Sequence, residues 1–306
     1  MTNLGFLMSD EDKPKQGFAI MDLSQIALAT TIKTIGEEKL TLGMMRHIVL
    51  NSIRHNALKF KKEGYTEIIL GVDNPLPQYW RRDIAYYYKK NRAKAREAST
   101  FDWESYFSFM KIIIQELKDN MPYIVCDIQT AEADDVIGVL SKYLSDQGHK
   151  VLIISSDGDF TQLQKFKNVS QYSAIQKKFI KFKNSSPEHD LLVKIVKGDK
   201  KDGISSIKTR SDYWLTRIEG ERSPSIKTSF ITELLESDDP LSLLDESEAK
   251  RFLENKQLLD LTMVREDIAK EILECYNGYQ KKGRKRVYSY FVKSGLSKLL
   301  KDINDF

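Results

Sequence analysis

The chain is poor in the residue types that mark several common protein classes. It has only two cysteines, Cys126 and Cys275, and four histidines among 306 residues. Neither cysteine has a metal-ligand spacing, so we expect two buried, reduced thiols in an intracellular protein. No apolar run approaches the ~20 residues that a membrane helix needs. No basic region followed by a long apolar stretch opens the chain either, so neither a membrane span nor a signal peptide is predicted.

The chain does have enough apolar residues for a packed core. Hydrophobic residues make up 41% of it, which argues against disorder. Lys and Arg number 48 and Asp and Glu 44, so the net charge is only +4. A balance this small says little about partners, and the distribution of charge matters more. The length favours two domains.

Strands and helices alternate in the first half of the chain. Apolar or β-rich runs predict strands at 17–21, 66–72, 123–128 and 151–155. Helical spacing of apolar residues predicts helices at 41–63, 102–119 and 132–147. This alternation predicts an α/β domain over 17–183, after an N-terminal tail at 1–16, with a mostly parallel sheet and helices on both faces.

Residues 184–306 are expected to form an all-helical C-terminal domain. Gly, Ser and Pro interrupt this part of the chain near residues 184–187, 203 and 220–224. Helical patterns lie between and after these breaks, at 188–197, 225–236, 241–261, 265–276 and 287–300.

Acidic residues follow all four predicted strands. They are Asp22, Asp73, Glu132, Asp134, Asp135, Asp157 and Asp159. Because parallel strands end at one edge of a sheet, we expect these side chains to converge there. Any one of them alone could be a turn former or helix cap. The same arrangement at four strand ends favours a shared site. A further pair, Asp199 and Asp202, could equally be a solvated turn.

Such a crowd of carboxylates needs cations. Two like charges about 4 Å apart repel by about 1 kcal/mol in water and by several times more in a protein. Oxygen ligands without nearby His or Cys select Mg²⁺, with Mn²⁺ as a substitute. A pair of such ions is an established apparatus for phosphodiester hydrolysis. The acids therefore predict a two-ion hydrolase.

A basic and aromatic segment follows the second strand. Residues 80–96 carry seven Lys and Arg against one Asp, and three tyrosines interleave. The basic residues are Arg81, Arg82, Lys89, Lys90, Arg92, Lys94 and Arg96. This mixture suits phosphates and stacked bases, whereas a solvated helix usually balances its charges. A second basic run, 281–286, would attract nucleic acid or another acidic partner, or be a solvated linker.

Five short motifs together resemble the 5′-nuclease (flap endonuclease) family. They are Ile20-Met21-Asp22, Gly71-Val72-Asp73, Glu132-Ala133-Asp134-Asp135, Ser156-Asp157-Gly158-Asp159 and Gly198-Asp199-Lys200-Lys201-Asp202. The motifs occur in the family's order, and none would be specific alone. The likeness extends from residue 17 to residue 299. It implies a PIN-like core fold, followed by a helical domain with a helix-hairpin-helix.

The resemblance also implies roles for individual residues. Two Mg²⁺ ions would be held by Asp22, Asp73, Glu132, Asp134, Asp157, Asp159 and Asp202. Asp135 and Asp199 match nearby acids that either bind metal or support it. A basic arch at about 76–100 would receive a single-stranded 5′ end, with Lys89 as the catalytic contact to the scissile phosphate and Arg81 assisting. Further nucleic-acid contacts would come from Arg82, Tyr88, Lys90, Arg92, Lys94, Arg96 and Lys227.

One part of the chain departs from the family pattern. In the helix-hairpin-helix, Gly203 replaces an Asn, and Ser205-Ser206-Ile207 replaces a Pro-Gly-Val turn. A long insertion then precedes Gly220. The resemblance therefore does not imply that this modified hairpin binds duplex phosphates as the family's hairpin does. The chemistry of the metal site is not affected by these differences.

The function that the resemblance implies is a Mg²⁺-dependent 5′→3′ exonuclease and flap endonuclease. It would cut RNA–DNA and DNA–DNA duplexes and remove RNA primers during lagging-strand replication of a phage, as a monomer in the cytoplasm of the infected cell. Expected partners are a sliding clamp docking Leu4, Phe6 and Leu7, and a single-stranded DNA-binding protein on the helical domain. Two alternatives are a PIN-type ribonuclease, which usually lacks the helical part, and a non-catalytic branched-DNA binder, which would not need all the acids.

Overall fold

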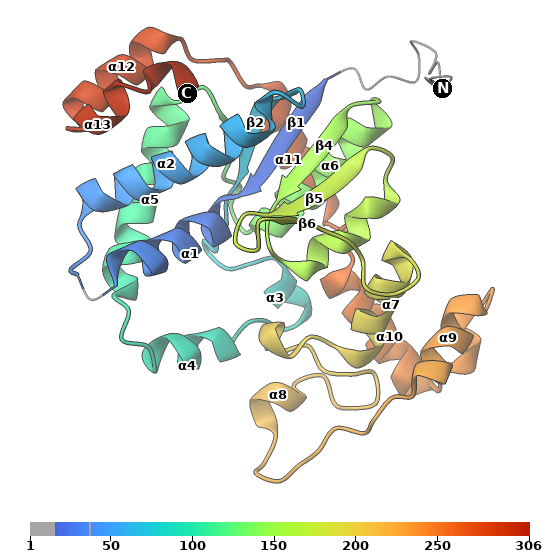
Figure 1. Cartoon of the computed structure of the whole chain (residues 1–306). Helices are drawn as coiled ribbons and strands as arrows, with labels where there is room; N and C mark the ends of the chain where they lie inside the picture. Colours follow the sequence, from blue (N-terminus) through green and yellow to red (C-terminus); the bar gives the residue numbers. More distant parts are fainter. Residues whose placement is uncertain (1–15, 37) are drawn as a thin grey trace, which may run out of the picture.

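A six-stranded sheet forms the centre of the computed structural model, which describes residues 16–36 and 38–306 (Figure 1). The strand order is β3-β2-β1-β4-β5-β6. Neighbouring strands are parallel except for β6, which runs antiparallel to β5 at one edge. The strands are β1 (Gly17–Asp22), β2 (Tyr65–Gly71), β3 (Ile124–Cys126), β4 (Lys150–Ile154), β5 (Val169–Ser173) and β6 (Lys178–Ile180). The mostly parallel sheet is thus confirmed.

Helices cover both faces of this sheet, also as predicted. Successive residues of a strand point to opposite faces, and β1 shows it clearly. Ala19 and Met21 pack with α1 (Leu23–Ile35), α2 (Leu42–Lys61) and α5 (Trp103–Asn120). Phe18 and Ile20 pack with α6 (Ala133–Asp146) and α11 (Glu266–Asn277) on the other face. Because both faces are covered, the central strands are mostly apolar over their buried lengths, although β2 carries the polar residues Thr66 and Glu67 near its start.

Capping residues explain where the predicted helices begin. Thr41 caps α2, its hydroxyl accepting a hydrogen bond from the Met44 amide at 3.3 Å. Asp102 caps α5 by accepting from the Ser105 amide at 3.0 Å. A side-chain oxygen at this position satisfies one of the free amides of the first turn.

Several elements were not predicted from the sequence, among them one helix and two strands that pack into the sheet domain. Helix α1 follows β1 without a loop, because Asp22 ends the strand and at once caps the helix by accepting from the Gln25 amide at 3.0 Å. Strand β6 forms one edge of the sheet and β5 lies next to it, and β5 reads VSQYS, which has no apolar run. The expectation of two buried thiols holds for Cys126, whereas Cys275 is only partly buried.

The remaining helices lie in two places. Helices α7 (Pro187–Lys197), α9 (Thr228–Glu236) and α10 (Glu246–Leu259) share a core with Tyr87 and Tyr88. By contrast, α11, α12 (Arg284–Lys293) and α13 (Ser297–Leu300) pack back onto the two cores of the sheet. The short helices α3 (Arg81–Ile84), α4 (Asn91–Glu97) and α8 (Tyr213–Thr216) complete the set. The boundary near residue 183 stays a prediction, and residues 184–306 do not pack as one body.

Two long helical patterns of the C-terminal part are shorter in the structure. The pattern at 241–261 becomes a 3₁₀ turn, Pro240–Leu243, followed by α10, which Asp245 caps. The pattern at 287–300 is divided into α12 and α13 at Gly295, which has a φ of 69°. That left-handed conformation costs glycine little and ends helices.

Two predictions concern the ends and the exterior of the chain. The expected clamp-docking residues Leu4, Phe6 and Leu7 lie outside the described residues. Over the part that the structure describes, no helix combines the length and the apolar character that crossing a membrane requires.

The packing of α11 against α6 can be tested by mutation. Ile272 is fully buried in the core shared with α6, and Ile272→Ala should lower the free energy of unfolding by about 2–5 kcal/mol. The neighbouring Glu271 is exposed, so Glu271→Ala should change stability by less than about 0.5 kcal/mol. Urea unfolding followed by circular dichroism should give one transition for each variant. A separate, early transition of the C-terminal helices in Ile272→Ala would contradict the shared core.

Candidate active site

Four acidic side chains meet at the carboxyl ends of the parallel strands. Asp22 ends β1, Asp73 follows β2, Asp157 follows β4, and Asp134 lies in the first turn of α6. Asp22 is repelled by both Asp73 and Asp157. Asp134 is repelled by Asp22 and Asp157 in turn. The structure thus brings together acids that the sequence places up to 135 residues apart (157 − 22).

Burial and mutual repulsion raise the pKa of three of the acids at this edge. Burial, with repulsion from Asp73, raises the pKa of Asp22 from 3.8 to about 7. Burial and repulsion from Asp157 raise the pKa of Asp159 to about 7 as well. Burial raises the pKa of Asp134 well above its ordinary value, and repulsion from Glu132 and Asp22 adds to the shift, whereas the nearby charge of Lys89 acts in the opposite direction. Within the described residues, the Asp134 side chain has no hydrogen bond or ion pair.

Glu132 has a different environment, because basic side chains surround it. It is buried and accepts hydrogen bonds from Arg81 Nη1 at 2.8 Å and Tyr88 Oη at 2.9 Å, and it pairs with Lys89 Nζ. Burial acts to raise the pKa of Glu132, but Lys89 and Arg81 outweigh it and lower that pKa. Glu132 is therefore an ionised carboxylate with its charge already balanced.

Asp135 anchors the same cluster to the start of α6. Its carboxylate accepts from the Glu132 amide at 2.8 Å and from Trp80 Nε1 at 3.0 Å, and lies 2.7 Å from Arg81 Nη2. Glu132 and Asp135 form a capping box. Arg81, 1% exposed, thus bridges two carboxylates. Its expected role beside the phosphate stays a prediction, and in the structure it orients Glu132.

The other acids are held by cations from the helical part. Lys194 of α7 pairs with Asp159 and, at 2.9 Å, with Asp199. Asp202 lies 2.5 Å from Arg92 Nη2 and 3.6 Å from Lys89 Nζ. Lys194 was not predicted from the sequence, where the only sign of its role is its position on a helix, five residues before Asp199. Trp80 was not predicted as part of the site either, because in the sequence it resembles any other apolar residue.

Glycine at position 198 lets the chain fold tightly between Lys194 and Asp199. Gly198 has a φ of 77°, and a Cβ there would lie 2.4 Å from the Ile204 carbonyl oxygen. The turn that follows runs through a 3₁₀ segment, Lys200–Asp202, to Gly203, also at a φ of 77°. This first part of the modified hairpin therefore directs Asp199 and Asp202 toward the acids of the sheet.

The basic segment divides into a buried and an exposed half. Tyr88 and Lys89 point inward, at 3% and 6% exposure. Lys90, Arg92, Lys94 and Arg96 lie on the exposed side, where Lys90 covers the Tyr86 ring and Arg96 the Phe107 ring. Arg82 is half-buried and donates to the Tyr88 carbonyl at 3.1 Å. Lys227, at the N-cap of α9, is exposed and makes no described contact with the acids.

Two cavities flank Arg92 beside these acids. One, of about 360 Å³, is lined by Asp157, Asp159, Lys194 and Asp202. The other, of about 520 Å³, lies between the basic segment and α5, with Asp73, Tyr79, Lys89, Arg96 and Phe107 in its wall. The second combines cations with exposed aromatic rings, which is the composition that single-stranded nucleic acid prefers.

The chemistry of the donors fits a hard divalent cation. The groups are carboxylates without nearby His or Cys, which select Mg²⁺ or Mn²⁺. Three have a raised pKa, as expected where added positive charge would relieve repulsion. As the side chains stand in the described residues, no three Asp, Glu, His or Cys lie close enough to hold an ion. Glu132, Asp135, Asp159, Asp199 and Asp202 pair with Arg81, Lys89, Arg92 or Lys194 instead.

Comparisons with known proteins agree with this site. A family model described as "5'-3' exonuclease, N-terminal resolvase-like domain" matches residues 36–191, and one described as "T4 RNase H, C terminal" matches 185–306. Ribonuclease H of Enterobacteria phage T4 is 53% identical over 302 residues, covering 98% of this chain and 99% of that protein. A 5'-3' exonuclease of Buchnera aphidicola subsp. Acyrthosiphon pisum is 34% identical over 105 residues, 34% of each chain.

Solved structures share the fold. The T5 5'-exonuclease with bound zinc has a TM-score of 0.60 at 17% identity, covering 86% of this chain and 99% of that one. A T5 flap endonuclease complex with DNA and metal ions has a TM-score of 0.60 at 18% identity, covering 86% and 100%. At such identities the likeness concerns the fold alone. With the T4 enzyme 53% identical over almost its whole length, this chain belongs to the 5′-nuclease family and is a nuclease.

Proposed function

We propose that this nuclease is a Mg²⁺-dependent 5′→3′ exonuclease and flap endonuclease that removes RNA primers from RNA–DNA hybrids and also cuts DNA duplexes. The observation that carries the proposal is the convergence of Asp22 and Asp134, both with a raised pKa, at one sheet edge, with Lys89 of the basic segment close to Asp134. A site of this charge needs cations to bind a phosphodiester, which is itself an anion. Mn²⁺ is expected to substitute for Mg²⁺.

The proposed ligands are the acids that lack a cationic partner. Asp22, Asp73, Asp134 and Asp157 would hold the ions, and Asp159, Glu132 and Asp202 would join when their lysine and arginine partners move. Bound divalent ions supply a hydroxide nucleophile at neutral pH and neutralise the developing charge on the leaving oxygen. Asp135 and Asp199 would orient neighbouring side chains rather than bind metal.

The basic residues are proposed to have different roles in catalysis and in binding the nucleic acid. Lys89 is buried between Glu132 and Asp202, so its ammonium lies at the border of the acids and the arch. It would donate to a phosphate oxygen there and stabilise the transition-state charge. Arg81 would act as a positioning residue through Glu132. Lys90, Lys94 and Arg96 are exposed and would attract the 5′ strand over a longer range.

The biological setting belongs to the same proposal. The relation to the phage T4 enzyme supports a phage protein that acts in an infected host cell. Action on replication intermediates, as a monomer, is part of the proposal. A sliding clamp at Leu4, Phe6 and Leu7 and a single-stranded DNA-binding protein on the C-terminal helices remain predicted partners. Lys227 and the modified hairpin are proposed to contact duplex phosphates at some distance from the acids.

Replacing Asp134 tests the site directly. Asp134→Asn should lower cleavage of a 5′-labelled RNA–DNA hybrid in Mg²⁺ by on the order of 10²–10³-fold, because one charge that binds metal is lost. In EDTA the wild-type protein should be inactive. The fold should be as stable as before or more so, since repulsion falls. Asp146→Asn, on the exposed end of the same helix, should cut normally. Wild-type rates for Asp134→Asn would show that the site is elsewhere.

Two adjacent lysines separate chemistry from binding. Lys89→Ala should lower kcat by about 10²-fold or more while the circular dichroism spectrum is unchanged. Lys90→Ala should mainly raise KM and reduce the salt dependence of binding, because it removes one exposed phosphate contact. The measurement is steady-state cleavage at several salt concentrations. Equal kcat values for Lys89→Ala and the wild type would remove Lys89 from the mechanism.

The raised pKa values predict an unusual dependence of stability on pH. The folded state retains protons on Asp22 and Asp159 up to about pH 7, whereas the unfolded chain loses them near 3.8. The contribution of these groups to stability in EDTA therefore decreases as pH rises from about 4 to 7. Mg²⁺ binding should strengthen over that range and release protons near pH 7. Calorimetric titrations in two buffers of different ionisation enthalpy measure this release. Proton uptake, or an affinity independent of pH, would contradict it.

A further inference from the structure

A separate cavity lies at the opposite end of the sheet from the acids. Its volume is about 260 Å³. Tyr65 and Thr66 at the start of β2 contribute to its wall, and Tyr123 stands just before β3. The end of α2, at Leu58 and Lys61, closes one side. Residues 281–287 close another, so the cavity includes the basic run that the proposed active site does not use.

A buried hydroxyl in this cavity has no partner. Tyr123 is 4% exposed, and its Oη makes no hydrogen bond to any of the residues that the structure describes. Burial raises the pKa of Tyr123, so the hydroxyl stays protonated and can donate. A buried donor without an acceptor costs about 1–3 kcal/mol, and native proteins rarely keep one. The group therefore points to a ligand that accepts a hydrogen bond.

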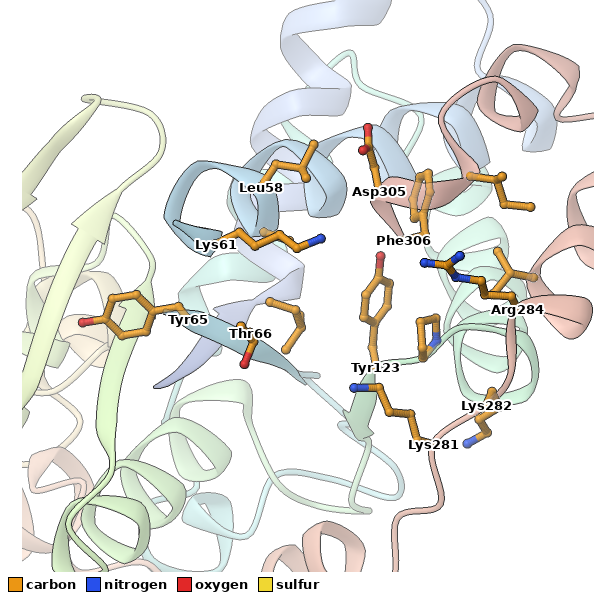
Figure 2. Close-up of a pocket in the computed structure, with 15 residues that line it drawn as sticks. Leu58, Lys61, Tyr65, Thr66, Tyr123, Lys281, Lys282, Arg284, Asp305 and Phe306 are labelled. Carbon is orange, nitrogen blue, oxygen red and sulfur yellow. The ribbon is translucent and has the colours of Figure 1, made fainter. Parts of the chain in front are cut away.

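Two free cations flank the hydroxyl. Figure 2 shows Lys61 and Arg284 directed toward the Tyr123 hydroxyl from opposite sides of the cavity. Neither side chain has a hydrogen bond or an ion pair anywhere in the described residues. The two lysines of the run that also line the cavity are engaged, since Lys281 pairs with Glu67 at 3.1 Å and Lys282 covers the Tyr279 ring.

One side-chain carboxylate also lines the cavity, and its charge is compensated only in part. Asp305 lies 3.6 Å from the guanidinium of Arg54, which pairs more closely with Asp302. With Lys61 and Arg284 against this one side-chain carboxylate, the cavity is net positive. Leu58, Val287 and Phe306 give the rest of the wall an apolar surface. Such a lining favours one anionic group, held by charge-assisted hydrogen bonds to the exposed Lys61 and Arg284 side chains.

We propose that this cavity binds a terminal phosphate, a phosphate monoester, between Lys61 and Arg284, with Tyr123 as hydrogen-bond donor. The volume lies below the roughly 300–1,000 Å³ of pockets for drug-sized ligands, which favours a single group that enters end-on. A phosphodiester inside a strand would need space for the chain on both sides. The group could belong to a free nucleotide or to a 5′ strand end, and binding requires neither a metal ion nor the acidic edge.

Calorimetric titration in EDTA tests this proposal without cleavage. The ligands are thymidine 5′-monophosphate, a thymidine trinucleotide with a 5′-phosphate, and the same trinucleotide with a 5′-hydroxyl. The phosphorylated trinucleotide should bind saturably, and its 5′-hydroxyl counterpart at least about tenfold more weakly. Equal affinity of the mononucleotide would show that a free nucleotide suffices, and weaker binding that a strand end is read. Both results support a terminal-phosphate site.

Three variants locate the binding. Arg284→Gln should weaken it about tenfold or more, whereas Arg286→Gln removes the same charge two residues away, outside the cavity, and should have little effect. Tyr123→Phe should also weaken binding, while the free energy of unfolding stays equal or rises because an unpaired buried hydroxyl is gone. That combination is not expected of a residue with a purely structural role.

Several results would overturn the proposal. They are the absence of saturable binding, equal affinity for the 5′-hydroxyl trinucleotide, and equal losses in Arg284→Gln and Arg286→Gln. Tighter binding of a hexaglutamate peptide than of any phosphate ligand would assign the cavity to an acidic protein segment instead. Since the variants lie outside the proposed active site, cleavage rates in Mg²⁺ report on that site independently.

Discussion

Repulsion among carboxylates at one edge of a parallel sheet is the constraint on which the rest of this structure depends. The topology brings the acids together, because β1, β2 and β4 are parallel neighbours and each ends near an acid. Basic side chains of the same chain balance part of this negative charge. Arg81 and Lys89 balance Glu132, and Lys194 balances Asp159. Asp22 and Asp134 have no such ion pair within the described residues, and burial with repulsion from neighbouring carboxylates raises the pKa of both. In the proposed function, this is the position where divalent cations bind.

These counterions come from outside the sheet, and this links the parts of the molecule. Arg81 donates through Nε to the Leu258 carbonyl of α10 at 3.0 Å, besides holding Glu132. The Lys89 amide donates to the Asp202 carbonyl at 2.8 Å. The basic segment thus lies between the acidic edge and the helical part and bonds to both. In the proposed function, a metal ion at this edge would compete with Lys89 and Arg92 for the same carboxylates, so ion binding and the position of the basic segment would be coupled through shared partners.

The sequence was informative where one residue decides a local structure. The apolar runs of β1 and β4 and the acid after each strand could be read directly, and they predicted the sheet and the meeting of the acids. Lys194 could not be found in this way, because nothing in a helix of mixed charge shows which lysine faces a distant turn. The burial of Arg81 was equally hidden, since a run of basic residues suggests a solvated surface until its packing is known. Strand β5 was not predicted because its polar residues, which lie near the sheet edge, form no apolar run.

The basic run at 281–286 lies too far from the acidic edge to balance its charge. It lies at the amino-terminal end of β2, whereas the acids lie at the carboxyl ends. A strand of six residues such as β1 spans about 20 Å. That exceeds the screening length of about 8 Å at physiological salt. Lys61 and Arg284 therefore cannot serve as counterions for Asp22 or Asp134. The acidic edge needs Lys89, Arg81 and Lys194 close by for the same reason, and the positive charge at the far end of the sheet stays available for an anion that binds there.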